Sequence, residues 1–110
     1  MHTDRLARLL EFIETEPNDP FLKYALATEY LRLNDEKKAL DYFQNLVEQH
    51  PDYVGTYYHL GKLYERLGQK DDAVFTYKKG MEIAQAAGDQ HARNELMGAL
   101  NQLQDMDFDD

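Results

Sequence analysis

The feature that most constrains this sequence is an internal repeat with a period of 34 residues. Sliding the sequence against itself by this distance superimposes identical residues of several types. A period of a few tens of residues is the signature of repeat proteins, whose units bury their apolar faces by stacking on their neighbours. The identical pairs include Pro17 with Pro51, Tyr24 with Tyr58, Leu26 with Leu60, Tyr30 with Tyr64, Arg32 with Arg66, Leu33 with Leu67, Ala39 with Ala73 and Glu48 with Glu82.

Each repeat is predicted to form a helix, a tight turn and a second helix. Over residues 20–33 the apolar side chains recur at spacings of three and four, which is the helical period. Pro20 suits the first helical turn and Asp19 can cap its free amide groups. Asn34 tolerates the left-handed conformation that ends a helix, and a second helix over 36–49 stops before Pro51.

The next repeat follows the same plan, with terminating glycines at Gly68 and Gly88 and a capping residue at Asp89. We therefore expect an all-α fold, an α-solenoid of antiparallel helix pairs with about six helices. The segment from Asp105 to Asp110 contains four aspartates and is expected to be a disordered acidic tail. The expected single domain spans 1–104, with repeat units at 20–53 and 54–87, helices at 53–67 and 70–87, and capping helices at 4–15 and 90–104.

Composition narrows the classes of partner. The chain has 21 acidic against 12 basic side chains, a net charge of −9, which argues against binding nucleic acids or anionic membranes. There is no cysteine, so neither a disulfide framework nor a thiolate metal site can form. The first residues lack the pattern of a secretory signal and no apolar run approaches the ~18 residues of a membrane span. We therefore expect a cytoplasmic location.

The repeat resembles the tetratricopeptide repeat family, whose pattern is an aromatic residue, Leu-Gly, Tyr, Ala, an aromatic residue and Pro. Lys23 departs from the pattern by occupying the slot of the first aromatic residue, and Gly80 and Gln85 depart from it later. The first unit matches at Leu26-Ala27, Tyr30, Ala39, Phe43 and Pro51, and the second unit matches at Tyr57, Leu60-Gly61, Tyr64, Ala73 and Tyr77.

The resemblance implies a protein–protein interaction scaffold whose first helix in each unit lines a concave groove. Lys62 and Arg66 share a helical face and, with Arg32 and two tyrosines, form a basic and aromatic strip that would suit an acidic peptide. The alternative is that these side chains are solvated and paired with local glutamates. The groove residues projected from the family are Phe21, Tyr24, Thr28, Leu31, Arg32, Tyr58, Lys62, Glu65, Arg66 and Arg93, with Met97 as a further candidate.

A related use of the family is a clamp for the acidic C-terminus of a chaperone, built from Lys, Asn, Asn, Lys and Arg. Four of the five corresponding slots differ here, so we predict against that function. The corresponding residues are Tyr24, Thr28, His59, Asp89 and Arg93.

Enzymatic and metal functions are not predicted. The histidines His2, His50, His59 and His91 lack the spacing of a helical zinc pair, and the alternating aspartates at 105, 107 and 109 lack the rest of a calcium loop. Phosphate-binding loops and nucleophile motifs are absent from the sequence. We expect no cofactor.

Two alternatives to peptide binding by the groove remain open. One is self-assembly, because the last helix carries a stripe of large apolar residues that could form a homodimer. The other is self-inhibition, in which the acidic tail occupies the basic groove. The stripe comprises Leu96, Leu100, Leu103, Met106 and Phe108.

Overall fold

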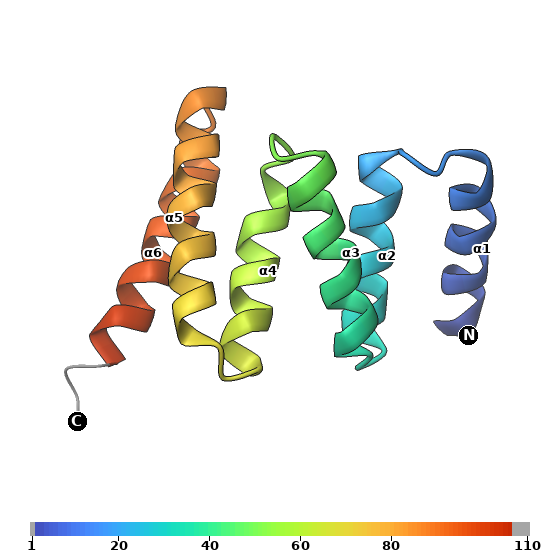
Figure 1. The fold of residues 1–110 in the computed structure, drawn as a ribbon, viewed down its shortest axis with the longest axis horizontal. Helices are drawn as coiled ribbons and strands as arrows, with labels where there is room; N and C mark the ends of the chain where they lie inside the picture. The colour runs from blue at the N-terminus through green and yellow to red at the C-terminus, as the bar shows by residue number, and fades with distance from the viewer. Residues whose placement is uncertain (1, 107–110) are drawn as a thin grey trace. The chain divides into compact units, whose positions relative to one another are not determined.

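The computed structural model describes the backbone of residues 2–106 and the side chains of residues 4–106, and within this range the chain forms six α-helices and no strand (Figure 1). The all-α prediction is therefore confirmed. The helices are α1 (His2–Thr15), α2 (Pro20–Arg32), α3 (Glu36–Gln49), α4 (Gly55–Arg66), α5 (Lys70–Ala87) and α6 (Gln90–Asp105).

The chain divides into two compact units, Met1–Tyr53 and Val54–Asp110. In the first unit α2 packs against both α1 and α3. In the second unit α5 packs against both α4 and α6, and α4 also contacts α6. Each unit is thus a set of three consecutive helices joined by short turns.

Most helix ends form where the local chemistry predicts them. Asp19 accepts hydrogen bonds from the backbone N–H groups of Phe21 and Leu22, at 2.8 and 3.3 Å. Asp89 caps α6 in the same way, accepting from the N–H of Ala92 at 3.0 Å. Asn34 has a φ of 63°, which confirms that this asparagine adopts the left-handed conformation after α2.

The fourth helix begins two residues later than the sequence predicts, at Gly55 rather than at residue 53. The N–H of Tyr53 donates to the carbonyl oxygen of His50 at 3.0 Å, so residues 50–53 form a turn after α3. Val54 then precedes the helix without any side-chain cap. Apolar periodicity could not detect this turn, because Tyr53 and Val54 fit the pattern of the helix that follows.

The core of the first unit lies between α2 and α3. Small side chains at Ala27 and Ala39 let the two helices approach closely, and both are fully buried. Leu26, Phe43 and Leu46 fill the remaining space and are also 0% exposed. Truncating Phe43 to alanine would cost about 3–5 kcal/mol of stability on the scale of other core substitutions.

In the core of the second unit, aromatic rings pack against glycines. A Cβ atom at Gly80 would lie 2.5 Å from Tyr57 Cβ, so this helical glycine permits close packing. Tyr77 is fully buried and Leu96 is 1% exposed. Tyr64, which matches the repeat pattern, is half-buried.

Most of the apolar stripe of α6 is buried inside the second unit. Leu96, Leu100 and Leu103 are 1–7% exposed, while Met106 is 60% exposed. The expected acidic tail and Phe108 fall at the end of the chain, and residues 107–110 lie outside the described residues, as does the side chain of His2.

Candidate functional site

In the second unit three of the projected groove residues contact one another along α4. The ammonium group of Lys62 lies 5.7 Å from the centroid of the Tyr58 ring and 3.8 Å from Glu65 Oε2. Tyr58 and Lys62 are one helical turn apart, which places them on the same face. We call these three residues the α4 cluster. The cation lies over an aromatic ring and beside one carboxylate, and its side chain is 38% exposed.

A fourth residue joins the α4 cluster from the neighbouring helix. The hydroxyl group of Tyr77, on α5, donates a hydrogen bond to Glu65 Oε2. Burial, followed by this hydrogen bond, raises the pKa of Tyr77, so the phenol stays protonated and remains a donor. The repeat pattern includes Tyr77 but did not reveal that its hydroxyl reaches Glu65.

The sequence contains a signal for this contact: the small residue Gly61 on α4 and the large residue Tyr77 on α5. A Cβ atom at Gly61 would lie 2.2 Å from Tyr77 Cε1, so only glycine at this position lets the ring cross α4. The ring then emerges beside Glu65, one turn further along the helix. Pairing the glycine of one helix with the aromatic residue of the next could have identified Tyr77 as a neighbour of the α4 cluster.

His59 lies at the edge of the α4 cluster. Its ring packs edge-on against Tyr58, with centroids 5.8 Å apart and an interplanar angle of 89°. Burial lowers the pKa of His59, and the negative charge of Glu95, on α6, opposes that shift. The imidazole therefore favours its neutral form at physiological pH.

Two other projected residues lie on α4 and α6. Arg66 is exposed at the C-terminal end of α4. Arg93 lies on α6, where it lines an open groove of about 600 Å³ between α5 and α6. The groove carries both charged and apolar side chains, namely Lys78, Met81, Glu82, Gln85, Arg93 and Leu100. Met97 is half-buried on the same helix as Arg93.

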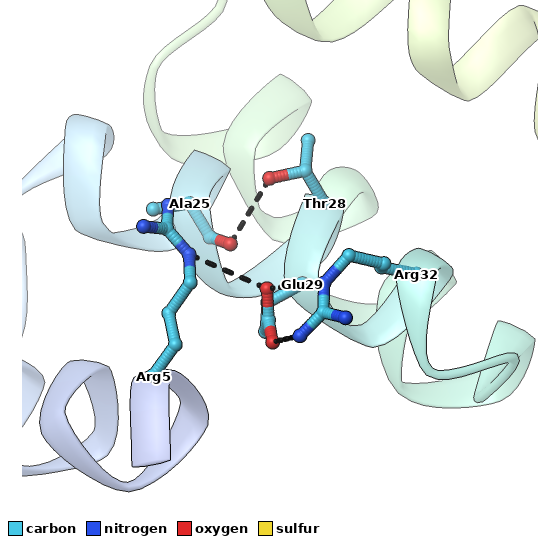
Figure 2. A network of polar contacts seen from close by, with 5 residues as sticks. All are labelled: Arg5, Ala25, Thr28, Glu29 and Arg32. Atoms are coloured by element: carbon cyan, nitrogen blue, oxygen red, sulfur yellow. Dashed lines mark hydrogen bonds and ion pairs between the residues drawn. The ribbon is translucent and has the colours of Figure 1, made fainter. Parts of the chain in front are cut away.

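In the first unit the projected residue Arg32 pairs with the local glutamate Glu29, as the alternative drawn from the sequence expects, and the network extends to a residue of α1 that the sequence did not predict. Its Nε atom donates to Glu29 Oε1 at 3.1 Å, and its Nη2 atom donates to Glu29 Oε2 (Figure 2). Arg5, on α1, pairs with the same carboxylate at 3.3 Å. The side chain of Glu29 is only 3% exposed, whereas the two arginines are 62% and 53% exposed.

This network ties α1 to α2 and fixes the guanidinium of Arg32. The hydrogen bond that Arg32 donates to Glu29 raises the pKa of Arg32, although desolvation opposes the shift. Figure 2 also shows Thr28 turned toward its own helix, where its hydroxyl donates to the carbonyl oxygen of Ala25 at 3.0 Å. Thr28 and Arg32 are therefore both engaged within the first unit.

The aromatic residues projected in the first unit differ in exposure. Phe21 is 61% exposed at the start of α2. Tyr24 is half-buried and packs on Tyr53, with ring centroids 5.5 Å apart. Leu31 is half-buried. Two exposed aromatic side chains were not singled out by the sequence, Phe12 at 56% and Phe75 at 71% exposure.

Within residues 4–106 there is no group of three or more His, Asp or Glu side chains arranged to hold a metal ion. In that same part of the chain no helix is long and apolar enough to cross a membrane.

Antiparallel helix pairs built from a repeated sequence define an α-helical repeat protein. Residues 30–94 match the family model described as tetratricopeptide repeat, and the chain belongs to the tetratricopeptide repeat family. This fold supports a protein–protein interaction scaffold in general, and proteins of this kind are generally non-enzymatic.

Solved structures agree with this assignment. A tetratricopeptide repeat domain protein from Salinibacter ruber is 52% identical, covers 78% of this chain and 96% of its own, and has a TM-score of 0.76. A protein from Bordetella parapertussis has a TM-score of 0.80 at 24% identity, covering 93% of this chain and 89% of its own. MamA has a TM-score of 0.69 at 19% identity, covering 98% of this chain and 70% of its own. The last two similarities show the fold alone. No match was found among curated proteins.

Proposed function

We propose that this protein is a scaffold that binds an acidic segment of another protein, and that the α4 cluster is part of the binding surface. The observation that carries the proposal is the position of Lys62 over Tyr58 and beside Glu65. A cation held by a ring and a carboxylate is preoriented, so a ligand carboxylate would meet it at a reduced entropic cost.

The hydrogen bond from Tyr77 makes this surface able to accept an anion. A ligand carboxylate must compete with Glu65 for the ammonium group of Lys62. Because Tyr77 also donates to Glu65, the glutamate would keep a partner when Lys62 turns toward the ligand. The Lys62–Glu65 distance of 3.8 Å is long for a hydrogen bond, which favours such an exchange.

We further propose that the residues projected on α2 contribute contacts in the first unit. Phe21 is exposed and offers an apolar side chain to a partner. The bonds from Arg32 to Glu29 use Nε and Nη2, so Nη1 is the nitrogen that would meet a ligand carboxylate. The surface of α2 between Phe21 and Arg32 would be supplied by Tyr24, Thr28 and Leu31.

Selection from a displayed library of random peptides tests this proposal. The wild type and a Tyr58→Ala, Lys62→Glu, Arg66→Glu variant are compared, with circular dichroism to confirm that the variant is helical. We expect the wild type to enrich peptides rich in Asp and Glu, and the folded variant to lose them. Enrichment of neutral or basic peptides, or equal binding by both proteins, would contradict the proposal.

Self-assembly through the C-terminal helix is the second candidate function. The 60% exposure of Met106 favours it, because this apolar side chain continues the stripe whose leucines are buried. Sedimentation of the wild type and of a Met106→Asp variant over a range of concentrations distinguishes the two functions. A concentration-dependent mass that disappears in the variant would support self-assembly, and a constant monomer mass would exclude it.

A further inference from the structure

The first unit contains a polar pocket that neither the α4 cluster nor the residues projected on α2 explain. It has a volume of about 380 Å³ and is lined by residues of α1, of the turn that follows, of α2 and of α3. This volume lies within the range of small-molecule sites, roughly 300–1,000 Å³. The lining residues are Ile13, Pro17, Asn18, Lys23, Asp41, Tyr42, Asn45 and Gln49.

The pocket includes a buried lysine. Lys23 is only 6% exposed, although lysine is among the residues least often buried. Within the described part of the chain its side chain makes no hydrogen bond or ion pair. The Nζ atom is not itself fully buried. The packed stem of Lys23 therefore presents its ammonium group to the pocket, where an anionic group of a ligand would pair with it.

Comparison with the second repeat shows that this feature is specific to the first. The residue 34 positions after Lys23 is Tyr57, which is 1% exposed and fills its site with an aromatic ring. At the same offset Asp41 corresponds to Phe75, and Gln49 corresponds to Ile83. The first repeat therefore carries a charged or amide group at three positions where the second carries an apolar or aromatic side chain.

The remaining lining groups can recognise a ligand that carries a positive charge as well as a negative one. Asp41 supplies an exposed carboxylate, and Asn18, Asn45 and Gln49 supply amides that both donate and accept hydrogen bonds. The Tyr42 ring is stacked on Tyr30, with centroids 5.9 Å apart, which holds one wall of the pocket in place. A bare dianion such as phosphate would be repelled by Asp41, whereas a ligand with both charges would find a partner for each.

We propose that this pocket binds a free α-amino acid, with Lys23 receiving the carboxylate and Asp41 receiving the ammonium group. The amide side chains would complete the hydrogen bonds of both ends. Ile13 and Pro17 provide an apolar wall for the ligand side chain. The site is independent of the partner surface on α4, because all its residues belong to the first unit.

Titration of the ¹⁵N-labelled full chain with glycine, leucine and glutamate tests the inference by chemical shift. Acetate, which lacks the ammonium group, and glycinamide, which lacks the carboxylate, are the comparison ligands, and phosphate is the dianion. We expect saturable shifts for at least one amino acid in residues 13–23 and 41–49, with weaker binding of acetate, glycinamide and phosphate. Absence of saturable shifts with all three amino acids would overturn the proposal.

Variants identify the groups responsible. Lys23→Met should weaken amino-acid binding by roughly tenfold or more, while Lys37→Met, at an exposed lysine on α3, should leave binding unchanged. Asp41→Asn changes an exposed residue and serves if Lys23→Met does not fold. It should weaken binding of the amino acid but not of acetate. Unchanged amino-acid affinity in either pocket variant would overturn the proposal.

Discussion

The hydroxyl group of Tyr77, on α5, donates a hydrogen bond to the carboxylate of Glu65, on α4. This bond joins a residue of the hydrophobic core to a residue of the proposed binding surface. It means that the orientation of Glu65, and through it that of Lys62, depends on the packing of the second unit.

Removing the hydroxyl group should destabilise the second unit. We expect Tyr77→Phe to lower the free energy of unfolding by about 1–2 kcal/mol, because a hydrogen bond to a charged acceptor is lost. Urea denaturation followed by circular dichroism measures the difference. Tyr42→Phe in the first unit is the control and should change stability by less than about 0.5 kcal/mol. Equal effects of the two substitutions would contradict the importance of the Tyr77–Glu65 bond.

A side chain at Gly61 should displace the Tyr77 ring. A Cβ atom there would lie 2.2 Å from Tyr77 Cε1, so we expect Gly61→Ala to cost about 1–3 kcal/mol in stability. Gly98→Ala is the matched control, since a Cβ atom at that helical position meets no packing neighbour within 4 Å among the described residues. The control should gain up to about 1 kcal/mol, because alanine favours the helix. Thermal unfolding of both variants measures the difference. A stabilising effect of Gly61→Ala would show that the Tyr77 ring does not need a glycine at position 61.

The buried carboxylate of Glu29 should contribute more to the stability of the fold than an exposed carboxylate does. Glu29→Gln removes the charge that Arg5 and Arg32 share, and we expect a loss of about 1–2 kcal/mol. Glu48→Gln, at an exposed position on α3, should be nearly neutral. Denaturation in low and high salt gives the comparison. A neutral Glu29→Gln would show that the two exposed arginines do not stabilise the contact between α1 and α2.

The environment of His59 predicts a pH dependence of stability. Its pKa is lowered in the folded protein, chiefly by burial, so near and below pH 6.5 the unfolded chain binds more protons at this site. Stability from the neutral imidazole is therefore present at pH 7 and decreases as the pH falls through the unfolded pKa of His, about 6.5.

The substitution His59→Gln should reduce this loss of stability between pH 7 and pH 5.5. The same measurement on His91→Gln provides the control, because the His91 side chain is 88% exposed. If wild type and His59→Gln lose equal stability over this range, the assigned burial effect is wrong.

Local chemistry allowed most of the fold to be predicted. The capping aspartates and the left-handed Asn34 are determined by residues within a few positions along the chain, so the sequence alone indicates these helix ends. The start of α4 was predicted two residues early because Tyr53 and Val54 continue the apolar pattern of the helix, although Pro51 and Asp52 are residues that favour the turn at 50–53.

The site was harder to predict, because its contacts join different helices. Spacing alone placed Lys62 and Arg66 on one helical face, and the contact between Lys62 and Tyr58 became visible in the structure. Spacing could not show that Arg5 reaches Glu29, because that pair depends on how two helices pack. The contact of Tyr77 with Glu65 is indicated only by pairing Gly61 with the aromatic residue of the next helix. Lys23 appeared only as a departure from the family pattern, and its burial became visible in the structure.

We propose that acidic ligands bind at Lys62 and its neighbours. The most direct test maps chemical shifts of the ¹⁵N-labelled chain on adding a peptide rich in Asp and Glu, with its Asn and Gln counterpart as the control. We predict saturable shifts centred on residues 58–66 for the acidic peptide, lost in Lys62→Glu and retained in Lys79→Glu, an equal charge change at an exposed position on α5. Shifts centred elsewhere, or unchanged affinity in Lys62→Glu, would contradict the account.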